Sequence, residues 1–383
     1  MIPIDIVYFD AGGGHRAAAN ALKAIAAEQK RPWDIRLVNL QELLDPLDVF
    51  RKVTRIRLQD LYNEMLAKGM TFGAATALKV VQGVMRLYHP QAKALLAEFW
   101  RKARPRLVVS VVPNLNRAMF EGLREADPAI PYVTILTDFA DFPPRFWIEQ
   151  QQQHFICGTR RAVEQAYALG HPPERVFEVS GMILRPVFYA TEEIDVEAER
   201  TLLGLRPDLP TGLIMFGGQG SGAMVGIVER LCRSELALQC IAVCGHNQKL
   251  ADRLRGMKGL RNPLHVVGFT QDIPYFMKLS DFFVGKPGPG SISEAIAMHL
   301  PVIIRRNILT LPQERYNADW VLEKKVGFVL SSWKDVEDAA HRLLEPPTFD
   351  AYRANAAAIQ NRAIFEIPEI LDRLLTMSAG SSR

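Results

Sequence analysis

The sequence predicts an α/β protein built from two tandem, doubly wound domains, each formed around a parallel sheet. Three observations predict this. The chain has 383 residues, 48% of them apolar, which exceeds what one hydrophobic core usually serves. Short apolar runs alternate with helical stretches in both halves, as expected for strands joined by crossover helices. Glycine-rich segments directly follow several of these runs, where parallel sheets bind ligands.

The first half is predicted to form one open parallel sheet. Its apolar, β-rich runs lie at residues 4–9, 35–40, 106–112, 132–136, 154–157 and 175–180, and a helix is expected from about His15. A polar, proline-punctuated stretch from Leu184 to Pro210 then separates this half from the next.

The second half repeats the pattern. Strands are expected at residues 212–218, 238–245, 264–269, 282–288, 301–306 and 326–330, and a short helix with a small polar tail closes the chain. We therefore expect two Rossmann-like domains, at residues 1–190 and 191–365, followed by a C-terminal helix and tail at 366–383. Two such sheets are expected to face each other across a cleft that binds ligands.

Positive charge is concentrated in one region. The net charge is +4, but residues 45–106 hold 12 Lys or Arg against 5 Asp or Glu, a local balance of +7 that leaves the remainder at −3. These cations alternate with apolar residues at spacings typical of amphipathic helices, which indicates either docking on an anionic membrane surface or ordinary solvated helix faces. No nucleic-acid-binding motif is present, and the pI of about 8.8 is moderate, so we expect no nucleic acid partner.

The location of the protein is expected to be cytoplasmic. The N-terminal segment MIPIDIVYFD has no basic region and too short an apolar run for a signal peptide, and no stretch approaches the roughly 20 apolar residues that cross a bilayer. Any membrane association would then be peripheral. The four cysteines are expected to be free thiols, and Cys240 and Cys244 to pack in the core, although a metal pair beside His246 is an alternative.

The loop after the first strand is predicted to bind a ligand. Residues 10–15 read Asp-Ala-Gly-Gly-Gly-His and lead into an alanine-rich helix, so the backbone near Gly14 can approach a ligand at a helix N-terminus. The spacing of a dinucleotide-binding fingerprint is also matched, by Gly12, Gly14 and Ala17, so a dehydrogenase is an alternative. That fingerprint requires an acid after the second strand, whereas this strand ends on Asn39.

His15 is a candidate general base. An imidazole at the positive end of a helix is biased towards its neutral form, which can accept a proton from an acceptor hydroxyl. The alternative is a histidine that only caps the helix.

Two further glycine loops indicate a nucleotide diphosphate site in the second half. Both offer unhindered backbone N–H groups to phosphate. Glu294 lies one turn into the following helix and could hold two ribose hydroxyls, or could simply stabilise the helix dipole. The two loops are Phe216-Gly217-Gly218-Gln219-Gly220-Ser221-Gly222 and Lys286-Pro287-Gly288-Pro289-Gly290-Ser291.

A polar cluster after the strand at 301–306 could read the hydroxyls of a sugar. It comprises Gln313, Glu314 and Asn317, with an ordinary helix start as the alternative. No acidic pair or histidine cluster is placed to hold a metal beside these loops. We therefore predict no obligatory metal and no cofactor, and expect helix dipoles, N–H groups and Lys286 to offset the leaving-group charge.

At this point the chain resembles the monogalactosyldiacylglycerol synthases over nearly its whole length. The segments that carry the resemblance are DAGGGHRAAANAL, CGHNQKL, GFTQD, GKPGPGSISEAIAMHLPVII and PQERYN, in this order. The family is related to the GlcNAc transferase of peptidoglycan synthesis and to processive diacylglycerol glucosyltransferases. The resemblance implies the two-domain fold called GT-B, a UDP-sugar donor, a lipid acceptor and inversion at the anomeric carbon.

The resemblance also implies roles for individual residues. His15 would be the catalytic base, with Asp138 orienting it or the acceptor, unless Asp138 is a plain turn residue. Phe269 would contact the uracil, and Glu294 the ribose. The diphosphate would lie on the loop around Gly218 and on the turn from Gly288 to Ser291, and the sugar would contact Gln313, Glu314 and Asn317. The family associates its basic helical region with membrane and acceptor binding, which favours lipid docking by residues 45–106.

Three positions depart from the family pattern. Phe142 precedes Pro143 where the family has histidine, and Pro312 and Tyr316 stand where it has glycine. Because of these differences, the sequence does not predict which hexose is transferred or which lipid accepts it. The alternatives are a UDP-sugar epimerase on the same fold, which would need no acceptor, transfer from UDP-GlcNAc to a non-glycerolipid acceptor, and a nucleotide-binding protein without catalysis.

Overall fold

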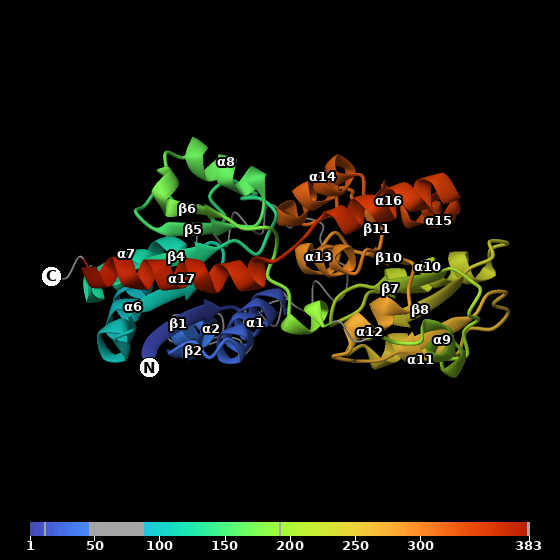
Figure 1. Ribbon diagram of the computed structural model, residues 1–383, viewed down its shortest axis with the longest axis horizontal. Coiled ribbons are helices and arrows are strands. Elements are labelled where there is room, and N and C mark those ends of the chain that lie inside the picture. The colour runs from blue at the N-terminus through green and yellow to red at the C-terminus, as the bar shows by residue number, and fades with distance from the viewer. Residues whose placement is uncertain (11–12, 46–87, 191–192, 381–383) are drawn as a thin grey trace. The chain divides into compact units, whose positions relative to one another are not determined.

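The computed structural model describes residues 1–10, 13–45, 88–190 and 193–380. Its backbone contacts divide these residues into two compact units, shown in Figure 1. Unit 1 takes in the described residues up to Pro186 together with those from Asn361, and unit 2 comprises the described residues of Val187–Gln360. The central part of the basic region, residues 46–87, lies outside the described residues.

Unit 1 contains a six-stranded, all-parallel sheet with the order β2-β1-β3-β4-β5-β6. All six strands that the sequence predicts in this half are present. Their bounds are β1 Ile2–Tyr8, β2 Trp33–Asn39, β3 Leu107–Ser110, β4 Tyr132–Ile135, β5 His154–Cys157 and β6 Val176–Glu178. The helices are α1 Gly14–Glu28, α2 Leu40–Leu44, α6 His89–Ala103, α7 Asn116–Ala126, α8 Arg160–Ala168 and α17 Ala363–Gly380.

Unit 2 contains a second six-stranded parallel sheet with the order β12-β11-β10-β7-β8-β9. Its six predicted strands are also confirmed. They are β7 Thr211–Met215, β8 Gln239–Val243, β9 Leu264–Val267, β10 Phe282–Gly285, β11 Val302–Arg305 and β12 Gly327–Leu330. The helices are α9 Val196–Leu202, α10 Ala223–Arg233, α11 Gln248–Arg255, α12 Ile273–Lys278, α13 Pro289–Ala297, α14 Arg315–Lys324, α15 Val336–Leu344 and α16 Pro346–Ala358.

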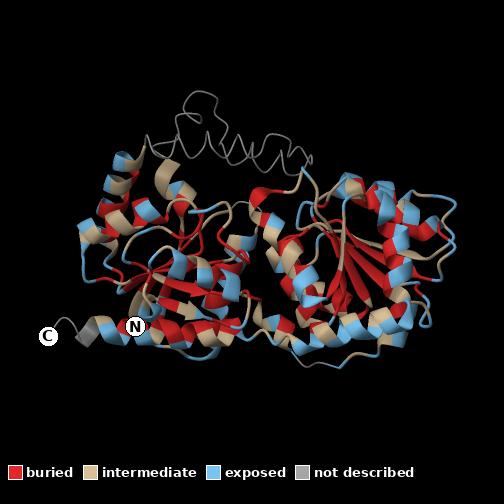
Figure 2. Ribbon diagram, turned by 90° about the horizontal axis from the view of Figure 1, so that it is seen from above, coloured by how far each residue is buried: buried red, intermediate tan, exposed pale blue. Residues whose placement is uncertain are grey.

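The cores follow from the sequence pattern. Parallel strands covered by helices on both faces are buried on both faces, which explains their continuous apolar runs. In β3, β4, β7, β8 and β10 every residue is buried, and Figure 2 shows the strands of both sheets mostly in the colour of buried residues. The helices are amphipathic by contrast, with exposed residues on their outer faces.

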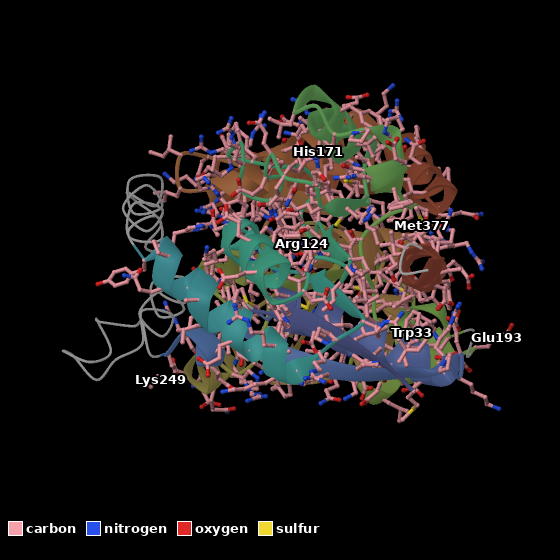
Figure 3. All side chains as sticks on the ribbon, turned by 90° about the vertical axis from the view of Figure 1, so that its left-hand side faces the viewer. Trp33, Arg124, His171, Glu193, Lys249 and Met377 are labelled. Atoms are coloured by element: carbon pink, nitrogen blue, oxygen red, sulfur yellow. The ribbon has the colours of Figure 1, made fainter. Side chains whose placement is uncertain are left out.

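Helix α17 belongs to unit 1, although it lies at the far end of the chain. It contacts α1, and its buried residues include Ile364, Ile367 and Leu371. Asp372 accepts a hydrogen bond from the Trp33 indole nitrogen at 3.1 Å and also pairs with Arg31. Figure 3 labels Trp33 on β2 and Met377 on α17 at the same side of this unit. The C-terminal segment therefore completes the unit that the N-terminus begins.

The described part of the basic region packs as an ordinary helix of unit 1. Helix α6 buries Leu96 and Trp100 in the same core cluster as α7 residues. Lys93 and Arg101 both pair with Glu125 of α7, at 3.1 and 2.8 Å. The described part of the region thus has protein partners for several cations, including Lys102, which pairs with Glu98. No helix among the described residues is both long and apolar enough to cross a membrane.

Candidate active site

The loop that carries His15 lies where the strand order of unit 1 reverses. Strand β1 lies between β2 and β3, so the chain adds β2 on one side of β1 and then adds β3 on its other side. In parallel sheets, ligands bind beyond the carboxyl ends of the strands at such a reversal of strand order. Helix α1 begins there at Gly14, after Gly13 with a φ of 81°, and no side chain caps it. His15 is therefore the second residue of a helix whose first N–H groups are open to a ligand.

The His15 ring is fixed by the ends of two other strands. Its Nδ1 lies 3.2 Å from Thr137 Oγ1, beyond β4, and the ring hydrogen-bonds the backbone of Val111, beyond β3. The side chain is half-buried. Burial lowers the pKa of His15 from 6.5 to about 4, although the Val111 hydrogen bond acts in the opposite direction. The imidazole is therefore neutral at pH 7, the form that a general base requires.

Asp138 is linked to the surroundings of His15 through a tryptophan. It is 7% exposed, and its Oδ2 accepts a hydrogen bond from the Trp147 indole nitrogen at 2.9 Å. The fully buried Trp147 ring lies 5.9 Å from the His15 ring between centroids. Asp138 is thus the polar partner of a ring that packs beside the candidate base.

A second aspartate holds the same segment in place. Asp141 accepts hydrogen bonds from the backbone N–H groups of Trp147 and Arg145, at 2.6 and 2.8 Å. The peptide bond between Phe142 and Pro143 is cis, so the position where the chain departs from the family pattern lies within this turn. The turn is well fixed, because its backbone N–H groups are bonded to a buried carboxylate.

The two glycine loops of unit 2 follow neighbouring strands. The order β12-β11-β10-β7-β8-β9 reverses between β10 and β7, and these two strands end at Gly285 and Met215. Gly217 and Gly220 adopt φ values of 74° and 60°, which side chains rarely tolerate. Both glycine loops therefore lie at the switch point of their sheet, where a nucleotide is expected.

The loop after β7 is packed tightly against the loop after β8. The His246 N–H donates to the Gly218 carbonyl at 2.8 Å. Gly245 has a φ of 59°, and a methyl group at this position would lie 2.1 Å from the Gly218 carbonyl oxygen. Glycine is thus required at 245 for the close approach of the two loops, although Gly218 and Gln219 themselves stay exposed.

The loop after β10 ends in an uncapped helix N-terminus. Gly288 is the N-cap of α13, Pro289 occupies the first turn, and no side chain caps the helix. The N–H groups of Gly290 and Ser291 therefore belong to a first turn that can bind an anion. Glu294 follows on α13 and is partly exposed.

The segment after β11 contacts this same loop. Glu314 ends a short 3-10 turn, Pro312–Glu314, and accepts a hydrogen bond from Lys286 Nζ at 2.9 Å. Asn317, on α14, donates from Nδ2 to the Pro287 carbonyl at 2.7 Å. Glu314 is buried and Asn317 completely so, whereas Gln313 is partly exposed.

Phe269, the predicted uracil contact, forms an exposed ring pair with His246. The ring is 55% exposed and stacks on His246 with centroids 3.9 Å apart and an interplanar angle of 17°. Because the two rings follow β9 and β8, which are neighbours, the pair lies on the side of the Gly218 loop away from β10. One flat aromatic surface is thus available beside that loop.

Residues 213–346 match the glycosyltransferase family 28 C-terminal domain. Over 97% of its length, and 72% of the relative's, the chain is 27% identical to monogalactosyldiacylglycerol synthase of Spinacia oleracea. The chain is a glycosyltransferase. The resemblance drawn from its motifs is thereby confirmed, and the matched segment contains every candidate donor-site residue of unit 2.

Solved structures confirm the GT-B fold of this glycosyltransferase. MurG of Acinetobacter baumannii superposes with a TM-score of 0.64 at 11% identity, covering 97% of this chain and 99% of that one. The UDP-GlcNAc 2-epimerase of Neisseria meningitidis superposes with a TM-score of 0.58 at 16% identity, covering 97% and 100%. WaaG, a glycosyltransferase involved in lipopolysaccharide biosynthesis, superposes with a TM-score of 0.56 at 14% identity, covering 98% of this chain and 100% of that one. A glycosyltransferase and an epimerase thus share this architecture, so the fold alone does not choose between them.

The cysteines of the glycosyltransferase pack in its cores. Cys240 and Cys244 are buried in the main hydrophobic cluster of unit 2, as expected, and burial raises the pKa of Cys244 to about 11. Within the described ranges no group of three or more His, Cys, Asp or Glu side chains could hold a metal ion. Independence from metal stays a prediction.

Several residues around the site were not predicted from the sequence. Thr137, Trp147 and Asp141 surround His15 or its partners, and His246 supports Phe269. Thr137 directly precedes the candidate Asp138, and His246 lies within one of the motifs, so both had a local signal. No local sequence signal pointed to Trp147, because its contact with His15 joins residues 132 positions apart.

Proposed function

We propose that this glycosyltransferase moves a hexose from a UDP-sugar onto a lipid acceptor such as diacylglycerol. The observation that carries the proposal is the similarity to monogalactosyldiacylglycerol synthase along 97% of the chain. Those relatives are named for making a galactosyl diacylglycerol. The departures at Phe142, Pro312 and Tyr316 lie near the candidate acceptor and sugar residues, so the proposal extends to a hexose and not to galactose in particular.

His15 is proposed to act as the general base of a single displacement. Its neutral ring accepts the proton of an acceptor hydroxyl while the hydroxyl oxygen attacks the anomeric carbon of the donor. The bond between that carbon and the β-phosphate oxygen breaks, and UDP leaves with the bonding electrons. One displacement inverts the configuration at the anomeric carbon.

The charge that develops on UDP is proposed to be offset by the loops of unit 2. The first N–H groups of α13 and the Lys286 ammonium are positively polarised or charged, and both belong to the loop after β10. Glu294 is proposed to hold the ribose, and Phe269 the uracil. No step requires a metal ion, and a chelator is therefore expected to leave turnover unchanged.

A lipid acceptor implies work at a membrane surface. We propose peripheral binding to the cytoplasmic side through residues 45–106, supported by the excess of positive charge there. The competing interpretation is that these residues form solvated helix faces, which the ion pairs of Lys93 and Arg101 with Glu125 favour for part of α6. An epimerase would need neither a lipid nor such a region.

The test is UDP release by purified protein supplied with UDP-galactose, UDP-glucose or UDP-GlcNAc, with EDTA present. Each donor is tried without vesicles, with neutral vesicles and with anionic vesicles, all vesicles containing diacylglycerol. Release that requires one donor together with the vesicles, and that is faster on anionic ones, is expected. Donor isomerised without any acceptor would instead identify an epimerase.

A further inference from the structure

Three polar residues after β11, Gln313, Glu314 and Asn317, are the sequence-predicted contacts to the donor sugar. Their contacts divide them into two groups. We propose that Glu314 and Asn317 are positioning residues of the diphosphate loop, acting through Lys286 and Pro287, and that Gln313 alone of the three reads the sugar. This inference rests on the proposed UDP-sugar donor.

Glu314 is placed to anchor Lys286. The carboxylate side chain is 10% exposed, the lysine side chain is 43% exposed, and the two are joined at 2.9 Å. A buried carboxylate is costly unless it is paired, and here the pairing cation reaches towards solvent while the acid stays inside. The arrangement therefore fixes the ammonium at the surface and leaves little of Glu314 for a ligand.

The lysine stem lies against both phosphate loops. Methyl groups built at Gly288 and Gly217 would lie 3.2 and 3.9 Å from Lys286 Cε. A side chain at Gly288 would therefore crowd the lysine stem, whereas one at Gly217 would only touch it, and the stem lies within van der Waals reach of both loops. An ammonium anchored there carries its positive charge beside both loops, and that charge can attract a diphosphate oxygen.

Asn317 is placed to hold the backbone of the same loop. Its side chain is completely buried, and Nδ2 donates to the carbonyl of Pro287, the residue between Lys286 and the helix N-cap Gly288. Pro287 cannot donate a backbone hydrogen bond of its own, so its carbonyl is the backbone group available for anchoring it. Asn317 thereby fixes the direction in which α13 begins.

Gln313 differs from both neighbours because its side chain is partly exposed. It lies in the 3-10 turn Pro312–Glu314, directly before the anchored Glu314. A residue that is held by the turn yet reaches solvent can donate and accept hydrogen bonds to sugar hydroxyls.

Calorimetric titration with UDP and with a non-transferred UDP-hexose analogue distinguishes the two roles. Glu314→Gln is expected to lower the affinity for both ligands by the same factor, about fivefold, because a charge-assisted anchor of the diphosphate site is lost. Gln313→Ala is expected to leave the affinity for UDP unchanged and to lower the affinity for the UDP-hexose analogue by about fivefold. Glu337→Gln, at an exposed acid of α15, is the control and is expected to change the affinity for neither ligand.

A double-mutant cycle with Lys286→Met tests whether Glu314 acts through the lysine. In that background Glu314→Gln is expected to change UDP affinity by less than about twofold. The inference would be overturned if Glu314→Gln weakened binding of the hexose ligand but not of UDP. It would also be overturned if Glu314→Gln weakened UDP binding as much in the Lys286→Met background as in the unaltered protein. Neither result would contradict the proposed UDP-sugar donor. Failure of the unaltered protein to bind UDP at all would overturn the proposed function and this inference with it.

Discussion

His15 is neutral for two physical reasons that act in the same direction. The N-terminus of α1 carries a partial positive charge, which disfavours an imidazolium, and burial lowers the pKa of the ring to about 4. Thr137 and Val111 fix the ring from two other strand ends. A residue in these surroundings is neutral at pH 7, which is the form that the proposed general base requires.

Replacement of His15 should therefore separate chemistry from binding. His15→Ala is expected to reduce turnover by roughly 10²–10⁴-fold, the range typical of a lost general base, with UDP affinity nearly unchanged. His341→Ala, at an exposed histidine of α15, serves as the control. Turnover by the His15 variant within a few-fold of the unaltered protein would remove this residue from the mechanism.

The pH dependence follows from the same pKa. Because the folded-state pKa of His15 lies near 4, below its ordinary 6.5, the free enzyme keeps the base unprotonated throughout the neutral range. The acid limb of kcat/KM is expected near pH 4 to 5, with a plateau above it. The stability that the neutral ring contributes is present above pH 6.5 and is lost as the pH falls through about 4. An acid limb centred at pH 6.5 would contradict the burial argument.

The glycine loops of unit 2 work as connected elements. Gly245 follows β8, yet it sets how closely the loop after β7 can approach, because only a residue without a side chain fits beside the Gly218 carbonyl. The positive φ of Gly245 adds a backbone reason for the same choice. The conformation of the Gly218 loop thus depends on a residue that belongs to a different loop.

Gly245→Ala is expected to displace the Gly218 loop and to weaken UDP binding by about tenfold, since the left-handed backbone alone costs about 1–2 kcal/mol. Titration of UDP measures this. Gly226→Ala, at a helical glycine of α10 with open space around it, should leave UDP binding unchanged and raise the free energy of unfolding by about 0.5–1 kcal/mol. Equal effects of the two substitutions would show that loop packing is not the cause.

At the scale of the whole molecule, unit 1 is built from both ends of the chain. Helix α17 buries Ile364, Ile367, Ile370, Leu371 and Leu374. At about 2 kcal/mol for each buried side chain, these five match the 5–15 kcal/mol that usually separates a folded domain from its unfolded state. The N-terminal part of unit 1 should therefore depend on the last helix for its stability.

Ile367→Asp should destabilise unit 1 by roughly 4 kcal/mol or more, because it buries an unpaired carboxylate in the contact between α17 and the rest of the unit. Met377→Asp, on the same helix at a residue that is 59% exposed, is the matched control. Denaturant unfolding followed by Trp fluorescence reports the difference. Similar unfolding midpoints for both variants would mean that α17 is not part of the unit 1 core.

Much of the architecture was determined by the sequence alone. Continuous apolar runs predict buried parallel strands, because residues shielded on both faces need no polar alternation, and all twelve predicted strands are present. Glycine loops at strand ends, such as those at Gly218 and Gly288, predict phosphate binding from local chemistry. His15 was predicted as a candidate general base in the same way, since the glycines and the helix beside it are adjacent in sequence.

Only the tertiary structure decided which distant residues meet. Strand order placed β10 beside β7 and so brought two glycine loops from separate parts of the chain together. The anchoring of Lys286 by Glu314, the contact of Trp147 with His15 and the return of α17 to unit 1 join residues far apart in sequence. Such contacts arise from packing, and local sequence patterns record which face of an element is buried but not what it is buried against.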